Sequence, residues 1–454
     1  MKIPKIYLAS HSGKNKRKLI EELFEKDKVI EDKDKVIEDK DKAIEKLEKE
    51  LKKYKNANTP SSASKHLKAD TLGLKAKKGA KRGAPKGHKG STFVWPEIDE
   101  IINLFVYKCA QCNSKNIKPT GYVKEKKVIC LIKAKTVVKM YHLQESRCND
   151  CNTLTLASHK DIPEKGIYDK NIQALVNYFK FRARVTFDPI VDIMNNIFNV
   201  PMTRPTALTI TRRTSDKLKP HYNQLEKDIN KLNVVHSDET SHSVNGTNHW
   251  IWVFCDSLFS LFKIQKERGG DIVEKTLGKD FKGKIVTDGW STYEVYSKKH
   301  KIIHQRCWDH LKREIEYECK INHPDLYKWV CDIYQMVRKG KKYKQEKRRK
   351  DMYKKCKAEL AMLINHMNTH TNLRKLANKI KNGGNKWFYC IIYPELPMNN
   401  NEAERSIRPF VVMRKIIGCL RSEIGMKNYE IMMSLISTWQ KQGKNTFYTL
   451  QTLL

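Results

Sequence analysis

Long apolar segments are missing from this sequence. It has no run of about 18 apolar residues, the length that a transmembrane helix requires. The first residues, Met1–Ser10, contain too short an apolar core for a secretory signal peptide. We therefore expect a protein that neither spans a membrane nor is exported by such a signal.

Acidic residues are scarce as well. The 51 Asp and Glu residues are outnumbered by 89 Lys and Arg residues, which gives a net charge of +38 at pH 7. So large an excess repels itself unless a polyanion neutralises part of it. Nucleic acid is the natural partner, and a highly basic protein without that role is the alternative.

The cysteines favour a metal site over disulfides. Two of the Cys-x-x-Cys pairs that hold metals are present, Cys109 with Cys112 and Cys148 with Cys151. In a cytosolic chain, four thiolates at this spacing match a closed, structural Zn²⁺ site. We predict a small β-rich zinc ribbon over residues 93–160, with a β-hairpin near 127–143 between the pairs. Four free thiols are the alternative.

The first 92 residues show two compositions. Residues 1–55 include a near-exact seven-residue repeat, in which Leu23, Ile30, Ile37, Ile44 and Leu51 form one seam. This pattern predicts a coiled-coil helix that joins copies of the chain into a homo-oligomer, or else a solvated single helix. Residues 56–92 are rich in Ser, Gly, Pro and Lys and predict a flexible basic linker. Lys81, Arg82 and Lys86 in this linker are candidates for contacts with DNA phosphates.

Residues 161–230 read as mostly helical. Apolar residues recur at helical spacing, and Asn199-Val200-Pro201 predicts a turn between two helices. Arg204, Arg212 and Arg213 lie nearby. The segment is either a helix-turn-helix that binds DNA or a helical connector that packs on the next domain.

From residue 231 to 454 the pattern becomes α/β. Strands are expected at 232–237, 250–255, 260–264, 284–287 and 301–305, with short helices at 271–277 and 291–296 and a tight turn at Asn245-Gly246. This order, βββαβαβ, is that of a ribonuclease-H-like sheet. Residues 309–395 predict a basic helical insertion. The fold class is therefore multidomain α/β.

Three acids stand out in this last region. Asp238 and Asp288 each follow an apolar strand, and Glu404 lies at the polar start of a helix. Carboxylates on separate elements can converge on hard cations, and oxygen ligands are what Mg²⁺ or Mn²⁺ prefers. Such a cluster is repulsive without metal, so at least one acid should titrate high. Glu239 should point to the opposite face of its strand.

Several motifs together resemble one known family. They are Asp238-Glu239-Thr240 with Trp250-Ile251-Trp252-Val253, Thr287-Asp288-Gly289, Cys307-Trp308-Asp309-His310-Leu311-Lys312-Arg313, and Asn400-Asn401-Glu402-Ala403-Glu404-Arg405-Ser406-Ile407-Arg408-Pro409. The chain resembles transposases of the insertion sequence 66 family, a branch of the DDE transposases. The linker and the four cysteines are also similar to those of that family.

The resemblance implies a function and a site. It implies that Asp238, Asp288 and Glu404 are catalytic, bind Mg²⁺ or Mn²⁺, and cleave and transfer strands of double-stranded DNA at transposon ends and targets. It further implies a prokaryotic, cytoplasmic protein associated with the nucleoid, with accessory proteins of the same element as possible partners. Another ribonuclease-H-like nuclease or integrase, and a non-catalytic zinc-containing DNA-binding protein, are the alternatives.

Basic residues beside the acids are candidates for DNA contacts. His310 and Arg313 are three residues apart, so they share a helix face; they contact the scissile phosphate or pair locally. Arg405 and Arg408 hold DNA phosphates or brace neighbouring acids. Trp250, Trp252 and Trp290 are expected in the core and not at stacked bases.

Overall fold

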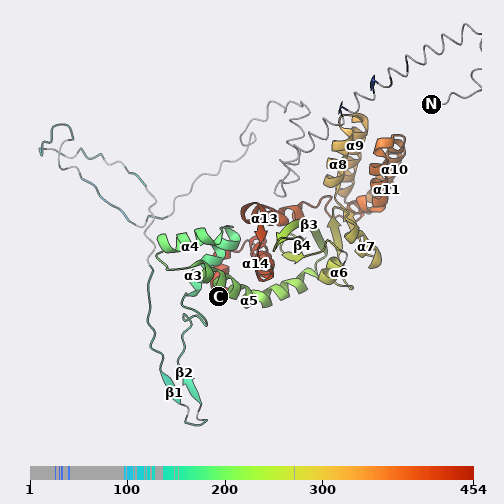
Figure 1. Ribbon diagram of the computed structural model, residues 1–454. Helices are drawn as coiled ribbons and strands as arrows, with labels where there is room; N and C mark the ends of the chain where they lie inside the picture. The colour runs from blue at the N-terminus through green and yellow to red at the C-terminus, as the bar shows by residue number, and fades with distance from the viewer. Residues whose placement is uncertain are drawn as a thin grey trace, which may run out of the picture. The chain divides into compact units, whose positions relative to one another are not determined.

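The computed structural model of the chain describes residues 136–454 except 148, 152 and 270. It also describes positions 26, 30, 32–33, 39–40, 97–98, 100–105, 107, 110–116, 118, 120–122 and 125–127. The chain divides into two compact units, residues 59–135 and the remainder. Most of the predicted coiled coil, the whole basic linker and two of the four zinc cysteines, Cys109 and Cys148, lie outside the described residues. The elements below belong to the unit that comprises residues 1–58 and 136–454, which is a mixture of α and β structure (Figure 1).

The centre of this unit is a mixed sheet. Its main path runs β5 (Ser260–Gln265), β4 (Thr247–Cys255), β3 (Val234–Val244), β6 (Lys284–Thr287) and β7 (His304–Arg306). Strands β5, β4 and β3 are antiparallel, whereas β6 and β7 run parallel to β3. A short strand, β8 (Cys419–Leu420), pairs in parallel with the end of β3. With α6 (Ile272–Leu277) and α7 (Ser291–Lys299), this confirms the predicted βββαβαβ order.

The hairpin between β3 and β4 begins the sheet. Asn245 and Gly246 both have positive φ, +47° and +75°, as a two-residue turn of the mirror-image type I requires. The predicted turn is therefore confirmed. Strand β3 does not end at Ser237 as expected, because residues up to Val244 remain paired with β4.

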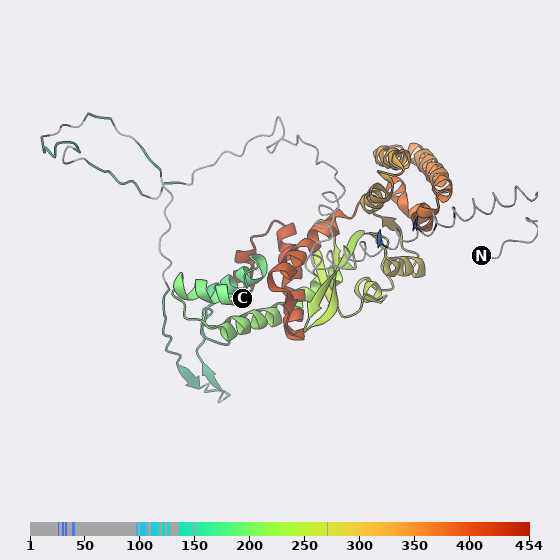
Figure 2. The same ribbon diagram turned by 45° about the horizontal axis from the view of Figure 1, so that its top comes forward.

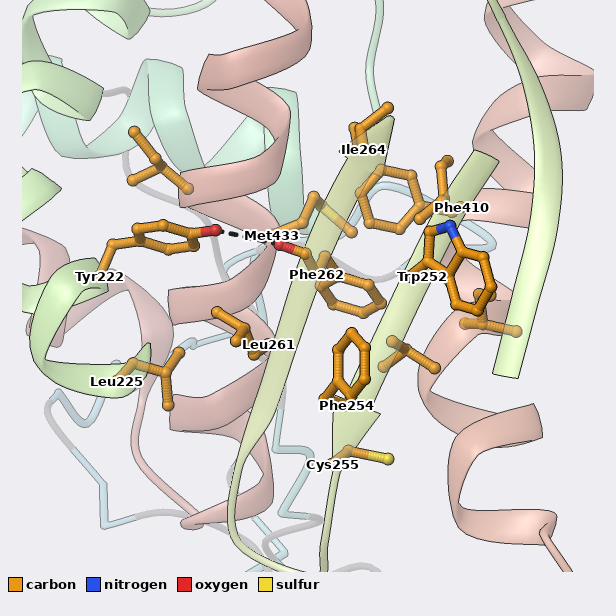
Figure 3. Close-up of a cluster of buried hydrophobic side chains, with 14 of the residues drawn as sticks. Tyr222, Leu225, Trp252, Phe254, Cys255, Leu261, Phe262, Ile264, Phe410 and Met433 are labelled. Atoms are coloured by element: carbon orange, nitrogen blue, oxygen red, sulfur yellow. Dashed lines mark hydrogen bonds between the residues drawn. The ribbon is translucent and has the colours of Figure 1, made fainter. Parts of the chain in front are cut away.

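Three helices pack against the antiparallel half of the sheet. Residues of α5 (Arg204–Ile229), α13 (Asn401–Ile417) and α14 (Glu423–Lys441) share one buried cluster with β4 and β5. Figure 3 shows Leu225 of α5 beside Leu261 of β5, and the Tyr222 hydroxyl directed at the backbone of Phe262, to whose carbonyl it donates at 3.2 Å. Burial of such side chains contributes about 1.5–3 kcal/mol each. The fold of this region is therefore held by long-range apolar contacts.

Strand β5 lies at an edge of the sheet, and side chains of α14 form hydrogen bonds with the backbone groups on its outer side. Ser434 Oγ accepts from Phe262 N at 2.9 Å, and a buried carboxylate, Glu430, accepts from Ile264 N at 2.7 Å. Thr438 Oγ1 accepts from Ser260 N at 3.0 Å and donates to Ser260 O at 3.1 Å. The three helix residues are four apart and so share one face of α14. This ladder blocks further strand pairing at β5.

The segment before the sheet is helical, as predicted. It contains α3 (Lys170–Asn177), a π-helical turn at Tyr178–Arg182, α4 (Phe187–Asn196) and α5. The last helix of the chain is α15 (Thr446–Leu453). Helices α3, α4 and the start of α5 share a small core that includes Ile190, Met194 and Ile210. The second half of α5 packs on the sheet through Leu218 and Ile229. Arg204, Arg212 and Arg213 are exposed along the first half of α5, and both the helix-turn-helix and the connector interpretation stay predictions.

Residues 308–392 form the helical insertion. Its helices are α8 (Trp308–Cys319), α9 (Pro324–Lys341), α10 (Glu346–Asn368), α11 (Arg374–Gly383) and α12 (Tyr389–Ile392), with two 3₁₀ turns around α11. They build a core of their own around Trp308, whose ring centroid lies 5.7 Å from that of Trp387. In Figures 1 and 2, α8–α11 lie at the opposite end of this unit from α3 and α4.

The predicted zinc segment contains one hairpin among its described residues. Strands β1 (Glu145–Arg147) and β2 (Leu154–Leu156) pair antiparallel on either side of the second Cys-x-x-Cys pair. The hairpin expected near 127–143 is not found in residues 136–143, which form no strand. Within the described residues, no helix is both long and apolar enough to cross a membrane.

Candidate active site

Asp238 lies in the middle of β3, opposite Val253 of β4. Neighbouring side chains alternate between the two faces of the strand. Ser237 and Glu239 both face α7, where the Tyr293 hydroxyl lies 3.1 Å from Ser237 Oγ and donates to Glu239 Oε2 at 2.9 Å. Asp238 therefore points the other way, and the prediction for Glu239 is confirmed. The face of Asp238 is the one on which α13 packs, since His236 there contacts Asn400, the residue before α13.

Asp288 follows directly after β6, as predicted. Trp290 N donates to Asp288 Oδ1 at 2.9 Å, and Gly289 N donates to Thr287 Oγ1 at 3.1 Å, so the turn holds this carboxylate in place. Gly289 has a φ of +89°, and a Cβ atom added there would lie 2.8 Å from Arg306 Nε. The turn therefore requires glycine for two reasons, its backbone conformation and the close approach of Arg306.

Glu404 lies in the first turn of α13, as predicted. Its Oε1 atom accepts from Arg313 Nη2 at 2.8 Å and lies 3.6 Å from His310 Nε2. Both partners come from α8, at the start of the insertion. In the structure both side chains contact Glu404, a candidate catalytic acid, and their contact with the scissile phosphate stays a prediction.

Asp288 and Glu404 both act electrostatically on Asp238. The pKa of Asp238 is raised well above its ordinary value, first by burial and then by the negative charges of Glu239, Asp288 and Glu404. The direction agrees with the prediction that at least one acid titrates high, and burial is a larger cause than repulsion. The pKa of His310 is lowered by burial and by Arg313, while Glu404 and Asp288 act in the opposite direction.

The donor set suits a hard divalent cation. Among the described residues, Oδ1 of Asp238 accepts from Glu239 N and Oδ1 of Asp288 accepts from Trp290 N, and no hydrogen bond engages either Oδ2 atom. Mg²⁺ and Mn²⁺ prefer such oxygen ligands. A cation would also relieve the mutual repulsion that contributes to the raised pKa of Asp238.

The three acids are not arranged as a complete metal-binding site. Across the described part of the chain, no group of three or more His, Cys, Asp or Glu side chains has the arrangement of a metal site. Arg313 already holds one oxygen of Glu404. Glu404 would therefore have to share this oxygen or turn its other one toward a cation.

Several residues around the acids were not singled out from the sequence. Arg268 donates to Glu239 Oε1 at 2.8 Å through Nη2, and its guanidinium lies over the rings of Trp250 and Trp290, 4.4 and 3.5 Å from the centroids. The core role predicted for Trp252 is confirmed, because its side chain is fully buried. Trp250 and Trp290 are half-buried and pack against the same core.

The remaining predicted residues divide into two groups. Arg405 pairs with Glu402 at 2.6 Å, which is the bracing role, and Arg408 is exposed on α13. Lys81, Arg82 and Lys86 of the linker lie outside the described residues, as do two of the zinc cysteines. The other two, Cys112 and Cys151, are exposed and fall in different compact units. The four-cysteine site therefore stays a prediction.

Comparison with known proteins identifies a family. A family model described as "Transposase IS66 family" matches residues 165–428, which is more than half of the chain and includes all three acids. No curated protein matches the chain.

Proposed function

Since the chain belongs to the IS66 family of transposases, we propose that it cleaves and transfers DNA strands at the ends of its own element. Asp238, Asp288 and Glu404 are the proposed catalytic acids. The observation that carries this assignment is electrostatic: the charges of Asp288 and Glu404, which belong to distant parts of the chain, both raise the pKa of Asp238. A carboxyl group whose pKa is strongly raised by burial and by specific neighbouring charges is a candidate for a functional site.

The strand order supports a ribonuclease-H-like catalytic domain. Three antiparallel strands are followed by two that run parallel to the first, and helices provide the crossovers. Asp238 lies on the central strand β3, and Asp288 lies at the carboxyl end of its parallel neighbour β6. In open α/β sheets, ligands bind beyond the carboxyl ends of the strands. The proposed site lies at such an end.

The proposed mechanism is metal-dependent. Bound Mg²⁺ or Mn²⁺ would activate the attacking oxygen and neutralise charge on the scissile phosphate. Asp238, Asp288 and Glu404 are the residues that would hold it. Arg313 and His310 lie against Glu404, so they are placed to contact a phosphate bound beside the acids. Arg268 and Tyr293 fix Glu239, which keeps it on the other face of β3.

The partners and the remaining metal follow from the same proposal. Double-stranded DNA, as element ends and target, is the proposed partner of the basic surface, including Arg408 and the linker residues. The four cysteines would hold Zn²⁺ in a structural site. The N-terminal repeat would join copies of the chain, and accessory proteins of the element are further proposed partners.

The triad can be tested directly. The full chain is incubated with Mg²⁺ and a labelled DNA fragment carrying the element ends, and cleavage and joining are measured with the variants Asp238→Asn, Asp288→Asn and Glu404→Gln. Each variant should abolish both reactions but still bind the DNA. Glu402→Gln is the matched control, because Glu402 lies in the same helix turn but pairs with Lys441 and Arg405. Full cleavage by any triad variant would falsify the assignment.

A further inference from the structure

Two buried residues, one just before the insertion and one just before α13, contact the chain segments next to all three acids. The first is Asn400, which has no exposed surface. Its Nδ2 atom donates to Ser237 O at 2.7 Å, and its Oδ1 atom lies 3.0 Å from His236 Nδ1. These partners are the two residues that precede Asp238.

The second residue is Cys307, which is also fully buried. Its backbone N donates to Thr287 O at 2.9 Å, and Thr287 is the residue before Asp288. Its Sγ atom accepts from Asn400 N at 3.2 Å, so the two buried residues are joined to each other. Asn400 O in turn accepts from Glu404 N at 3.1 Å.

These contacts lie beyond the last residues at which β3 and β6 pair directly with each other. The pairing of β3 with β6 ends at His236 and Val286, two residues before Asp238 and Asp288 respectively. Past that point, the side chain of Asn400 binds the carbonyl of Ser237, while the carbonyl of Thr287 stays in the β6–β7 ladder, where Cys307 N donates to it. The junction of these two residues therefore continues the connection between the strands at the level of the acids.

The side chain of Asn400 contacts β3 and does not cap α13. Asn400 is the residue immediately before α13, where asparagine normally caps the helix with its side-chain oxygen. Here the side chain makes no capping bond and contacts β3 on both its donor and its acceptor atoms. An amide is suited to this position because it offers a donor and an acceptor together.

We propose that Asn400 and Cys307 are positioning residues that set the relative placement of Asp238, Asp288 and Glu404 for metal binding. This inference rests on the proposed function. Residues that orient metal-binding side chains through hydrogen bonds typically change metal affinity by about 10–100-fold when mutated. Misplacement of reacting groups by about 1 Å reduces rates by about 100-fold. Loss of the junction should therefore weaken metal binding and slow cleavage.

The chain offers a conservative pair of variants at Cys307. Cys307→Ala removes the acceptor for Asn400 N, whereas Cys307→Ser keeps one. We expect Cys307→Ala to raise the Mn²⁺ concentration at half-saturation by about tenfold or more, and Cys307→Ser to stay within about threefold of the natural protein. Asn400→Ala should resemble Cys307→Ala. The matched control is Cys319→Ala, which removes another fully buried thiol of the same helix region but touches none of the acids.

The experiment measures Mn²⁺ binding to the full chain without DNA, by electron paramagnetic resonance, followed by cleavage of element-end DNA. Mn²⁺ prefers oxygen ligands, so it reports on the acids and not on the cysteines. A role in stability alone would lower the melting temperature of Cys307→Ala and Cys319→Ala alike and leave the Mn²⁺ midpoint unchanged. If the Asn400 variant does not fold, the Cys307 pair still provides the test.

Asp238→Asn distinguishes the two proposals. Loss of Mn²⁺ binding in Asp238→Asn, Cys307→Ala and Asn400→Ala, with recovery in Cys307→Ser, supports the junction. Loss in Asp238→Asn alone overturns the junction and leaves the proposed function intact. Unchanged Mn²⁺ binding in Asp238→Asn overturns both.

Discussion

Gly289 gives the sharpest test of the geometry around Asp288, because the chain contains a matched glycine elsewhere. Gly289→Ala introduces two separate penalties. An alanine at a φ of +89° costs about 1–2 kcal/mol for its backbone conformation. Its Cβ atom would also lie 2.8 Å from Arg306 Nε and 3.1 Å from Arg306 Cδ, which requires Arg306 to move.

Arg306 cannot move without loss. It is 6% exposed and donates to Glu294 Oε1 at 2.7 Å. Full rupture of a buried ion pair costs about 3–5 kcal/mol. A partial displacement should therefore add about 2–3 kcal/mol to the backbone penalty. The total expected loss in the free energy of unfolding for Gly289→Ala is about 3–5 kcal/mol.

Gly246→Ala is the control. Gly246 has a φ of +75° in the turn between β3 and β4, and a Cβ atom there would meet no atom within 4 Å. This variant carries the backbone penalty alone, about 1–2 kcal/mol. The difference between the two variants in urea unfolding of the full chain isolates the contact with Arg306. A second measure is the double variant Gly289→Ala with Arg306→Ala, whose loss should be smaller than the sum of the single losses.

The inferred contact between a Cβ atom at position 289 and Arg306 is contradicted if Gly289→Ala and Gly246→Ala reduce the free energy of unfolding equally. Losses that agree within about 0.5 kcal/mol count as equal, because effects at independent sites add only to within that margin. Gly289→Ala should in addition slow DNA cleavage, because the residue adjoins Asp288. Gly246→Ala should leave cleavage unchanged. These two readouts separate a general loss of stability from a local disturbance of the site.

Two further predictions concern the sheet. Thr438→Val leaves the backbone N and O of Ser260 without a partner and should reduce the free energy of unfolding by about 2–4 kcal/mol. The control, Thr452→Val at an exposed position, should change it by less than about 0.5 kcal/mol. Equal losses for the two variants in urea unfolding would contradict the ladder along β5. Burial lowers the pKa of His304 from 6.5 to about 3, so its neutral form stabilises the fold above pH 6.5, and this stability should fall by about 1.4 kcal/mol per pH unit below that value. His304→Gln should reduce the slope of the free energy of unfolding against pH, between pH 6 and 4, by the amount that one proton contributes. An unchanged slope would show that His304 does not titrate in this way.

The acids show how far local sequence patterns reach. An apolar strand followed by an acid and a glycine placed Asp288 correctly, and a polar helix start placed Glu404 correctly. Asp238 was misplaced relative to its strand, because the polar run after it resembles a loop. That run remains in β3 because β4 pairs with it along its whole length, including Val244 with Thr247.

The Arg313 contact shows what local patterns leave out. Its spacing from His310 indicates only that the two share a helix face. Their common partner, Glu404, lies 91 residues beyond Arg313 in the chain. A pairing of this kind depends on how α8 and α13 pack, so both roles considered for Arg313 were compatible with the sequence.

The sequence by itself determined the family, the strand order, the tight turn at Asn245-Gly246, and the identity of the three candidate acids. Each of these depends on residues that are close together in the chain or on motifs read in order. Tertiary structure alone decided the ladder along β5, the contact of Arg306 with Gly289, and the junction of Asn400 with Cys307. Asn400 and Ser237 are 163 residues apart, so their hydrogen bond exists only because packing of the sheet, insertion and α13 brings them together.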